Sequence, residues 1–276
     1  MIARRRRKSN SNRLGVLVLI TATFYFLSLL ISDASSISRD EPVSVLDKPI
    51  GATPIPKQTL RTVRRPRFNS QSNEDKALYE MIYKDKAPEY GGVILEMGAL
   101  DGVTFSISMF FEKFLGWKSI LIEANPKNFK KLVVNRPKSI NIYSAVCAGD
   151  SISFIGDSAV GGAKEFMKEG HKKRWIKNNA EVSVPCTTFG SIFDKHHIHG
   201  IDVFVLDVEG GELEALEVMD WTVPVGIFVI ELSGGPKDEQ VRKLLYRNGY
   251  IATNWNIRDF CNKGGDCSDN ECFVKK

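Results

Sequence analysis

Short apolar runs of strand length alternate with helix-like stretches from Asn73 to the end of the chain. In the helix-like stretches, apolar residues recur every three to four positions, as they do along one face of a helix. This alternation predicts an α/β fold, in which a mostly parallel sheet carries helices on both faces. The expected strands are residues 93–97, 119–123, 141–146, 202–207, 225–231 and 250–254, and the expected helices lie near 110–115, 129–133, 213–219 and 241–245.

Local signals mark where several of these helices begin and end. Asn125 followed by Pro126 is typical of a helix N-cap and the first helical residue. Gly116, Gly200 and Gly249 stand where helices are expected to stop, because glycine accepts the left-handed conformation that closes many helices. A helix end is also expected at the histidine cluster His196, His197 and His199.

By composition the 276 residues divide into four segments. Residues 1–13 form a basic tail, 14–31 an uncharged apolar run, 32–72 a flexible stalk containing serine and proline, and 73–276 the one folded domain that we expect. With 43% hydrophobic and 26% charged residues, the chain has the composition of a globular protein.

The apolar run 14–31 predicts a transmembrane helix, because its 18 uncharged residues reach the lower end of the roughly 17–25 that span a bilayer. The basic tail before it should stay in the cytosol. The domain would then lie in the lumen of the Golgi or endoplasmic reticulum, or outside the cell, as in a single-pass type II membrane protein. The competing interpretation is a signal peptide cleaved near Ala34, which would make the domain secreted. We favour the anchor because the run exceeds a signal-peptide core.

The net charge of +5 comes from the tail rather than from the domain. Residues 1–13 hold six of the 38 basic residues and no acidic one, which leaves 32 basic against 33 acidic residues in the rest. A nucleic-acid-binding domain needs its basic excess on the folded part. We therefore expect no nucleic-acid partner.

An exported domain would expose its cysteines to an oxidising compartment, where disulfides form. Their number is odd, so at least one thiol stays free or pairs between chains, and the spacing leaves the pairing open. The spacing also fails to match a zinc site, so we expect no metal. The five cysteines are Cys147, Cys186, Cys261, Cys267 and Cys272.

Two motifs at the ends of the first two expected strands outline a nucleoside pocket. Ligands of doubly wound sheets bind beyond the carboxyl ends of the strands. The first strand continues into Glu96-Met-Gly-Ala-Leu-Asp-Gly, where Gly98 and Gly102 allow a tight turn and a close approach of the backbone to a ligand. The second strand ends at Glu123, whose carboxylate can accept hydrogen bonds from both ribose hydroxyls.

The glycine spacing argues against a dinucleotide. In the fingerprint Gly-x-Gly-x-x-Gly the second glycine lets the backbone approach a pyrophosphate, and Leu100 occupies that position here. A nicotinamide-dependent oxidoreductase is therefore the weaker hypothesis. The carboxylates of Glu96, Asp101 and Glu123 instead suit a sulfonium cofactor, which offers an ammonium group, a positive sulfur and ribose hydroxyls.

A third acidic segment follows the expected strand 202–207. It brings Asp207, Glu209 and Glu212 to the same rim, with two glycines among them. Clustered carboxylates raise one another's pKa, so Asp207 or Glu209 could act as a general base toward a hydroxyl. The alternative is a structural turn at the two glycines, with Glu212 capping the next helix.

Taken in order, the motifs resemble the FkbM-type S-adenosylmethionine-dependent methyltransferases. The resemblance covers roughly residues 74–256 and rests on ILEMGALDGVTFS, GWKSILIEANPKNFKKLVVNRP, SVPCTTFGSIF, IDVFVLDVEGGELEAL and IFVIEL. It implies a Rossmann-like methyltransferase fold with a seven-stranded sheet, S-adenosyl-L-methionine as cofactor, and O-methylation of a hydroxyl on a sugar or other small metabolite. It also implies cofactor-binding roles for Glu96, Gly98, Asp101, Gly102, Glu123 and Asp207, and a match of Asp207, Glu209, Gly210 and Glu212 to the family's DxEGxE segment.

Two positions depart from the family pattern. Leu100 stands where many members have Asn, and Ile107 replaces an Asn often seen in the helix that follows. These apolar replacements motivate an alternative function, a non-catalytic, membrane-tethered adaptor that keeps the methyltransferase fold and binds protein cargo. As an enzyme, the chain would catalyse an in-line displacement with Asp207 or Glu209 as the base. The sequence identifies neither the methyl acceptor nor a protein partner.

Overall fold

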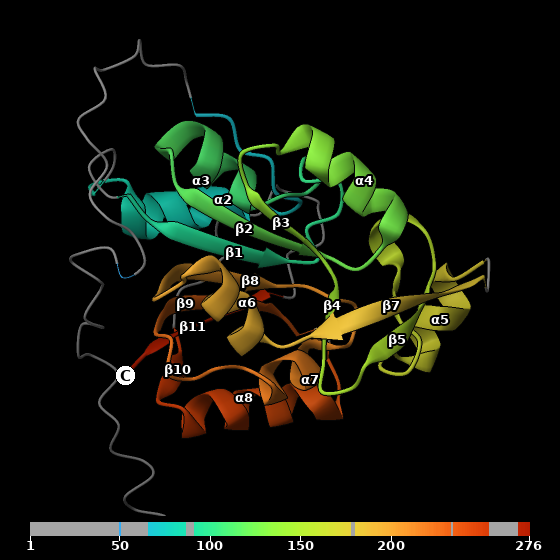
Figure 1. The fold of residues 1–276 in the computed structure, drawn as a ribbon. Helices are drawn as coiled ribbons and strands as arrows, with labels where there is room; N and C mark the ends of the chain where they lie inside the picture. The colour runs from blue at the N-terminus through green and yellow to red at the C-terminus, as the bar shows by residue number, and fades with distance from the viewer. Residues whose placement is uncertain (1–49, 51–65, 87–90, 178–179, 233, 254–269) are drawn as a thin grey trace, which may run out of the picture. The chain divides into compact units, whose positions relative to one another are not determined.

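The computed structural model describes residues 50, 66–86, 91–177, 180–232, 234–253 and 270–276, which all belong to one compact unit, 45–276 (Figure 1). The expected transmembrane helix 14–31, the basic tail and most of the stalk lie outside the described residues. No helix within those described ranges is both long and apolar enough to cross a membrane.

A seven-stranded sheet forms the centre of this unit, in the order β10-β11-β9-β8-β1-β2-β3. From β9 to β3 all neighbouring strands are parallel, whereas β11 runs antiparallel to both β9 and β10. The predicted Rossmann-like sheet is thus confirmed as a mixed sheet that is mostly parallel. Its strands are β1 (Val93–Met97), β2 (Lys118–Glu123), β3 (Ile140–Tyr143), β8 (Ile201–Leu206), β9 (Val225–Glu231), β10 (Tyr250–Ala252) and β11 (Asn270–Lys275).

Helices cover both faces of the sheet, as the alternating pattern predicted (Figure 1). Every residue of β1 and β8 is buried, because a parallel sheet between two helix layers is shielded on both sides. On one side lie α2 (Glu74–Leu78), the π-helical η1 (Tyr79–Tyr83), α3 (Ser108–Leu115) and α4 (Pro126–Asn135). On the other lie α6 (Phe189–His196), α7 (Glu212–Glu217) and α8 (Pro236–Arg247).

The helix boundaries follow the local signals of the sequence. The Asn125 side chain accepts the backbone N–H of Lys127 at 2.9 Å and caps α4, with proline next in the chain. Gly116 ends α3 in the left-handed conformation, with φ of 74°. The histidine cluster does lie at a helix end, where His197 closes α6 with φ of 51°. The predicted helix stop at Gly200 is wrong, because Gly200 directly precedes β8.

A second, smaller sheet was not foreseen from the sequence. The predicted strand 141–146 is wrong as a single element, because the chain leaves the main sheet after Tyr143. The Ser144 hydroxyl then donates to the carbonyl of Pro185 at 2.8 Å, and the next two residues pair with another strand. This sheet has the order β4-β7-β5-β6, from β4 (Ala145–Val146), β5 (Ser151–Ile155), β6 (Gly162–Ala163) and β7 (Glu181–Thr187), with η2 (Ser158–Val160) and α5 (Glu169–Trp175) in its connections.

One disulfide links two neighbouring strands of the small sheet. It joins Cys147, just after β4, to Cys186 in β7, with the two Cα atoms 5.5 Å apart. Cys272 in β11 is a buried free thiol. The pairing that the sequence left open is therefore settled for these three cysteines, while Cys261 and Cys267 lie outside the described residues.

Candidate active site

The turn after β1 joins three strands at their carboxyl ends. Gly98 adopts φ of 89°, and a β-carbon there would lie 1.8 Å from the backbone oxygen of Asp207. Its N–H donates to the Ile122 carbonyl of β2 at 3.0 Å, while the Asp207 N–H donates to the Met97 carbonyl at 3.1 Å. Only glycine fits this position, because the backbone is left-handed and lies directly against Asp207, the residue that follows β8.

The rest of this turn is held by its own polar groups. Asp101 accepts the backbone N–H groups of Val103 at 3.0 Å and Thr104 at 2.7 Å. Partial burial opposes ionisation, but these hydrogen bonds outweigh it and lower the pKa of Asp101. Gly102 has φ of 75°, and a β-carbon there would lie 2.5 Å from a methyl of Leu132 on α4. Asp101 and Gly102 thus shape the loop against α4.

Glu123, at the end of β2, is linked to the same turn. Its Oε2 accepts the Leu100 N–H at 2.8 Å, and its Oε1 accepts the Asn125 N–H at 2.7 Å. The side chain is buried, and burial raises its pKa to about 7 although these hydrogen bonds act in the opposite direction. Leu100 makes its hydrogen bond from a left-handed conformation, φ 49°, which is rare for a leucine.

Glu96, in β1, is buried beneath the loop that follows the strand. Its carboxylate accepts the hydroxyls of Ser106 at 2.8 Å and Ser108 at 2.5 Å, and the Ile107 N–H at 2.7 Å. Burial raises its pKa despite these donors. These contacts tie β1 to the start of α3, and the predicted role of Glu96 in cofactor binding stays a prediction. The side chain of Ile107, one of the family departures, is buried in the core.

Arg136 extends this network and was missed by the sequence analysis. Its side chain is fully buried, and it donates to the Gly102 carbonyl at 2.9 Å. It also forms an ion pair with Glu112 at 2.7 Å. Although burial acts against ionisation of Glu112, hydrogen bonds from Arg136, Lys113 and Ser139 lower its pKa to about 2. Arg136 therefore fixes the loop that follows β1, at Gly102, to α3 and α4.

Asp207, after β8, lies within a cluster of carboxyl groups. Its pKa is raised well above the usual aspartate range by the surrounding protein atoms, by a hydrogen-bonded carboxyl of Glu231, and by Glu212 and Glu74. Because the side chain itself is exposed, we attribute the shift mainly to the neighbouring carboxylates. Within the described ranges, no group of His, Cys, Asp or Glu side chains is placed to hold a metal ion.

The segment after Asp207 is closed by Glu212 and presents Glu209. Glu212 accepts the N–H groups of Val208 at 3.2 Å and Gly210 at 3.1 Å, so it holds the turn. Burial and the charges of Asp207 and Glu212 raise the pKa of Glu209 to about 8. A carboxyl with such a pKa exchanges protons near neutral pH, as a general base requires.

Glu74 reaches this cluster from the segment predicted as the end of the stalk and the start of the domain. It accepts the Ser72 N–H at 2.9 Å and the Asn270 side-chain amide at 3.2 Å. The stalk residue Phe68 already packs on Phe110, with ring centroids 4.7 Å apart. The chain from Phe68 onward is therefore part of the packed structure around the site.

An apolar hollow of about 460 Å³, counting space open to solvent, lies where β1, β2 and β8 end. The first two strands contribute Met97 and Ala124, and the segment after β8 contributes Val208. The small sheet closes the other side with Phe154 and Gly162. The strand ends predicted to hold a ligand therefore border an apolar opening in the protein surface.

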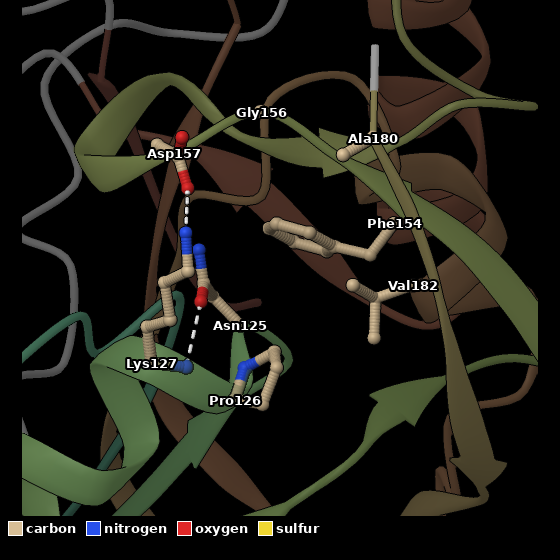
Figure 2. A pocket seen from close by; sticks show the side chains of 8 residues that line it. All are labelled: Asn125, Pro126, Lys127, Phe154, Gly156, Asp157, Ala180 and Val182. Carbon is tan, nitrogen blue, oxygen red and sulfur yellow. Dashed lines mark hydrogen bonds and ion pairs between the residues drawn. The ribbon is translucent and has the colours of Figure 1, made fainter. Parts of the chain in front are cut away.

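A second hollow of about 380 Å³, again including open space, adjoins the first across Phe154. Figure 2 shows Asn125 and the ion pair of Lys127 with Asp157 on one side, and Phe154 with Val182 on the other. The Lys127–Asp157 distance is 2.8 Å and both side chains are exposed, so the pair contributes little stability but offers polar groups to a ligand.

Comparison with known protein families and solved structures identifies the family of this chain. Residues 96–252, more than half of the chain, match the model of the methyltransferase FkbM domain. The chain therefore belongs to the FkbM methyltransferase domain family, and the predicted family is confirmed. No protein of curated function is detectably similar to it in sequence.

Several solved structures are distantly similar. A TehB-like SAM-dependent methyltransferase from Corynebacterium glutamicum is 15% identical, with a TM-score of 0.35 over 75% of this chain and 90% of that one. Aeropyrum pernix fibrillarin with bound S-adenosyl-L-methionine is 11% identical, with a TM-score of 0.36 over 66% and 65%. An O-methyltransferase from Bacillus cereus in complex with SAH is 14% identical, with a TM-score of 0.36 over 76% and 84%. At such distances no activity is inferred from them.

Proposed function

We propose that this chain transfers a methyl group from S-adenosyl-L-methionine to a hydroxyl of a sugar or other small metabolite. The observation that carries the proposal is the turn at Gly98, which presses on Asp207 and, through Leu100, bonds to Glu123 beside an apolar hollow. The three motifs of the sequence thus meet at one edge of the sheet, inside the region that matches the family.

Glu123 retains the capacity to hold the ribose. Each of its oxygens accepts one backbone N–H, and a carboxylate offers about four lone-pair sites in all. The Asn128 side chain also hydrogen-bonds to this carboxylate, so about one lone-pair site remains for a ribose hydroxyl. Met97, Ala124 and Val208 would surround the apolar part of the nucleoside. When bound, the cofactor would supply an electrophilic methyl group on positive sulfur. The chain would align the acceptor hydroxyl with it and take the hydroxyl proton at Glu209 or Asp207.

A few polar groups in the second hollow support a hydroxyl-bearing acceptor. It combines the ring of Phe154 with the amide of Asn125, the ammonium of Lys127 and the carboxylate of Asp157. Binding sites for small polar molecules typically join apolar walls to a few hydrogen-bonding groups. Most residues that line this hollow belong to β5, β7 and the connections of the small sheet.

Calorimetry with S-adenosylhomocysteine tests the cofactor site. The full chain, purified in a mild detergent, should bind this ligand saturably. Gly98→Ala should abolish binding, because its β-carbon would collide with the Asp207 carbonyl, whereas Gly149→Ala meets no atom within 4 Å and should bind normally. Failure of the unaltered chain to bind at millimolar ligand would refute the enzyme hypothesis and favour the non-catalytic adaptor.

We also propose that the domain is lumenal or extracellular, held by a single-pass type II anchor at residues 14–31. The disulfide between Cys147 and Cys186 supports an oxidising compartment, because such bonds are rare in the cytosol. An Asn-x-Thr glycosylation site engineered into residues 32–72 should be glycosylated in cells. Persistent absence of glycan, with reduced cysteines, would contradict this topology. Retention of the unprocessed N-terminus would distinguish the anchor from a cleaved signal peptide.

A further inference from the structure

His171 lies on α5, between β6 and β7, and contacts the candidate base Glu209. Its Nδ1 lies 3.3 Å from Oε2 of Glu209, and its Nε2 lies 3.0 Å from the carbonyl oxygen of Val160. The two side chains are 19% and 21% exposed, so the pair is largely withdrawn from solvent but still reachable. The histidines that stand out in the sequence, at the end of α6, take no part in this contact.

The contacts determine where the protons lie. A carbonyl oxygen only accepts hydrogen bonds, so Nε2 of His171 must carry a proton toward Val160. Nδ1 then either accepts a proton from a protonated Glu209 or holds it while Glu209 is ionised. Either way the two side chains share one proton across the 3.3 Å contact. Burial and the charges of Asp207 and Glu212 raise the pKa of Glu209, so they favour the form in which Glu209 holds the shared proton and Nδ1 accepts it.

The backbone holds this pair beside the first hollow. Glu209 adopts φ of 58°, a left-handed conformation that is uncommon for glutamate. Strand β6 lies directly against it, since a β-carbon on Gly162 would be 3.3 Å from the β-carbon of Glu209. Gly162 and Val208 both line the hollow. The segment that carries α5 therefore brings His171, and β6 lies against Glu209, at the edge of the same hollow.

We propose that Glu209 and His171 form a proton relay for the acceptor hydroxyl; the proposal rests on the function proposed above. As the acceptor oxygen bonds to the methyl carbon and the carbon–sulfur bond breaks, the electron pair of that bond goes to sulfur and neutralises its charge. The hydroxyl proton passes to Oε1 of Glu209 while the proton on Oε2 moves to Nδ1 of His171. His171 ends as an imidazolium and later releases the proton to water. Glu209 touches the acceptor, and His171 acts through it.

Nitrogen NMR of the histidine rings tests the pair without any turnover. His171→Gln identifies the signal among the four histidines of the full chain. In the neutral ring we expect a proton on Nε2 and an accepting Nδ1. Glu209→Gln should preserve this arrangement, because its amide can donate to Nδ1, whereas Glu209→Ala should free Nδ1. A ring protonated on Nδ1 alone, or one indifferent to Glu209→Ala, would overturn the relay.

Two assays test the role of the pair in catalysis. One measures transfer of a labelled methyl group to a mixture of glycans and metabolites, and the other measures binding of S-adenosylhomocysteine. His171→Gln and Glu209→Gln should bind the ligand normally but transfer at least about 100-fold more slowly, since an acid or base contributes roughly 100-fold or more. His199→Gln, an exposed control at the end of α6, should match the unaltered chain. Normal transfer by His171→Gln would overturn the relay alone. Absence of ligand binding by the unaltered chain would overturn the proposed function and the relay together.

Discussion

Replacing Glu123 with glutamine should stabilise the folded domain near pH 8 and change its stability little near pH 5. Burial raises the pKa of this carboxyl from its ordinary 4.5 to about 7. At about 1.4 kcal/mol for each pKa unit, ionisation of Glu123 costs the folded state about 3 kcal/mol relative to the unfolded chain. Glutamine matches the protonated acid in shape and never ionises. Its amide nitrogen cannot accept one of the two backbone N–H groups, a loss of about 1 kcal/mol that leaves a net gain of about 2 kcal/mol near pH 8.

The direction follows from proton binding. Between about pH 4.5 and 7 the folded state holds the Glu123 proton more tightly than the unfolded chain does. The contribution to stability is therefore complete below pH 4.5, declines as the pH rises, and is lost above about pH 7. Glu123→Gln should remove this part of the pH dependence, while Glu209 and the other buried carboxyls keep theirs.

Urea unfolding of the full chain, followed by tryptophan fluorescence in one detergent at both pH values, measures the difference. Glu217→Gln, on the exposed side of α7, is the matched control and should behave like the unaltered chain at both. The same Glu123→Gln variant should bind S-adenosylhomocysteine more weakly, because an acceptor for ribose hydroxyls is lost. Equal stability of the variant and the unaltered chain near pH 8, or a variant less stable at both pH values, would refute the reasoning.

Three further changes test the packing around the site. Reduction of the Cys147–Cys186 disulfide, which spans 39 residues, should lower the free energy of unfolding by about 4 kcal/mol from loop entropy; an unchanged urea midpoint would contradict this. Leu100→Asn should raise stability by about 1 kcal/mol, since asparagine tolerates the left-handed backbone better, and a lower melting temperature would show that leucine packing matters more. Arg136→Met should cost about 3–5 kcal/mol by leaving Glu112 without its buried partner, and adding Glu112→Gln should restore part of that loss in the same urea assay.

The sequence predicted those parts of the fold that depend on local signals. β1 and β9 coincide with the expected apolar runs, and α4 begins at the Asn-Pro signal. The predicted strands did not include β11, which pairs antiparallel with β9 through residues 270–274. This pairing joins segments far apart in the sequence, so no local signal reveals it. The small sheet was likewise overlooked, because β4 and β6 have only two residues each and several residues of β5 and β7 are exposed or half-buried.

The site shows the same division. The sequence placed Gly98, Glu123 and Asp207 at strand ends, and parallel topology alone brings such ends together. It could not find Arg136, whose partners Glu112 and Gly102 lie 24 and 34 residues away. An isolated arginine near the end of a helix is typical of a solvent-exposed residue, and only the fold shows that this one is buried.

Strain and charge are concentrated at one edge of an otherwise regular sheet. Leu100 and Glu209 both hold left-handed backbone conformations, and Asp207, Glu209 and Glu123 all have raised pKa values. Such features destabilise a fold, and they persist where the surrounding structure constrains them for a function. A docking surface for protein cargo does not need ionisable groups with raised pKa values beside an apolar hollow. Their placement around the Gly98 turn therefore favours the enzyme over the adaptor. It also predicts that substitutions which remove a buried charge will stabilise the domain and weaken ligand binding.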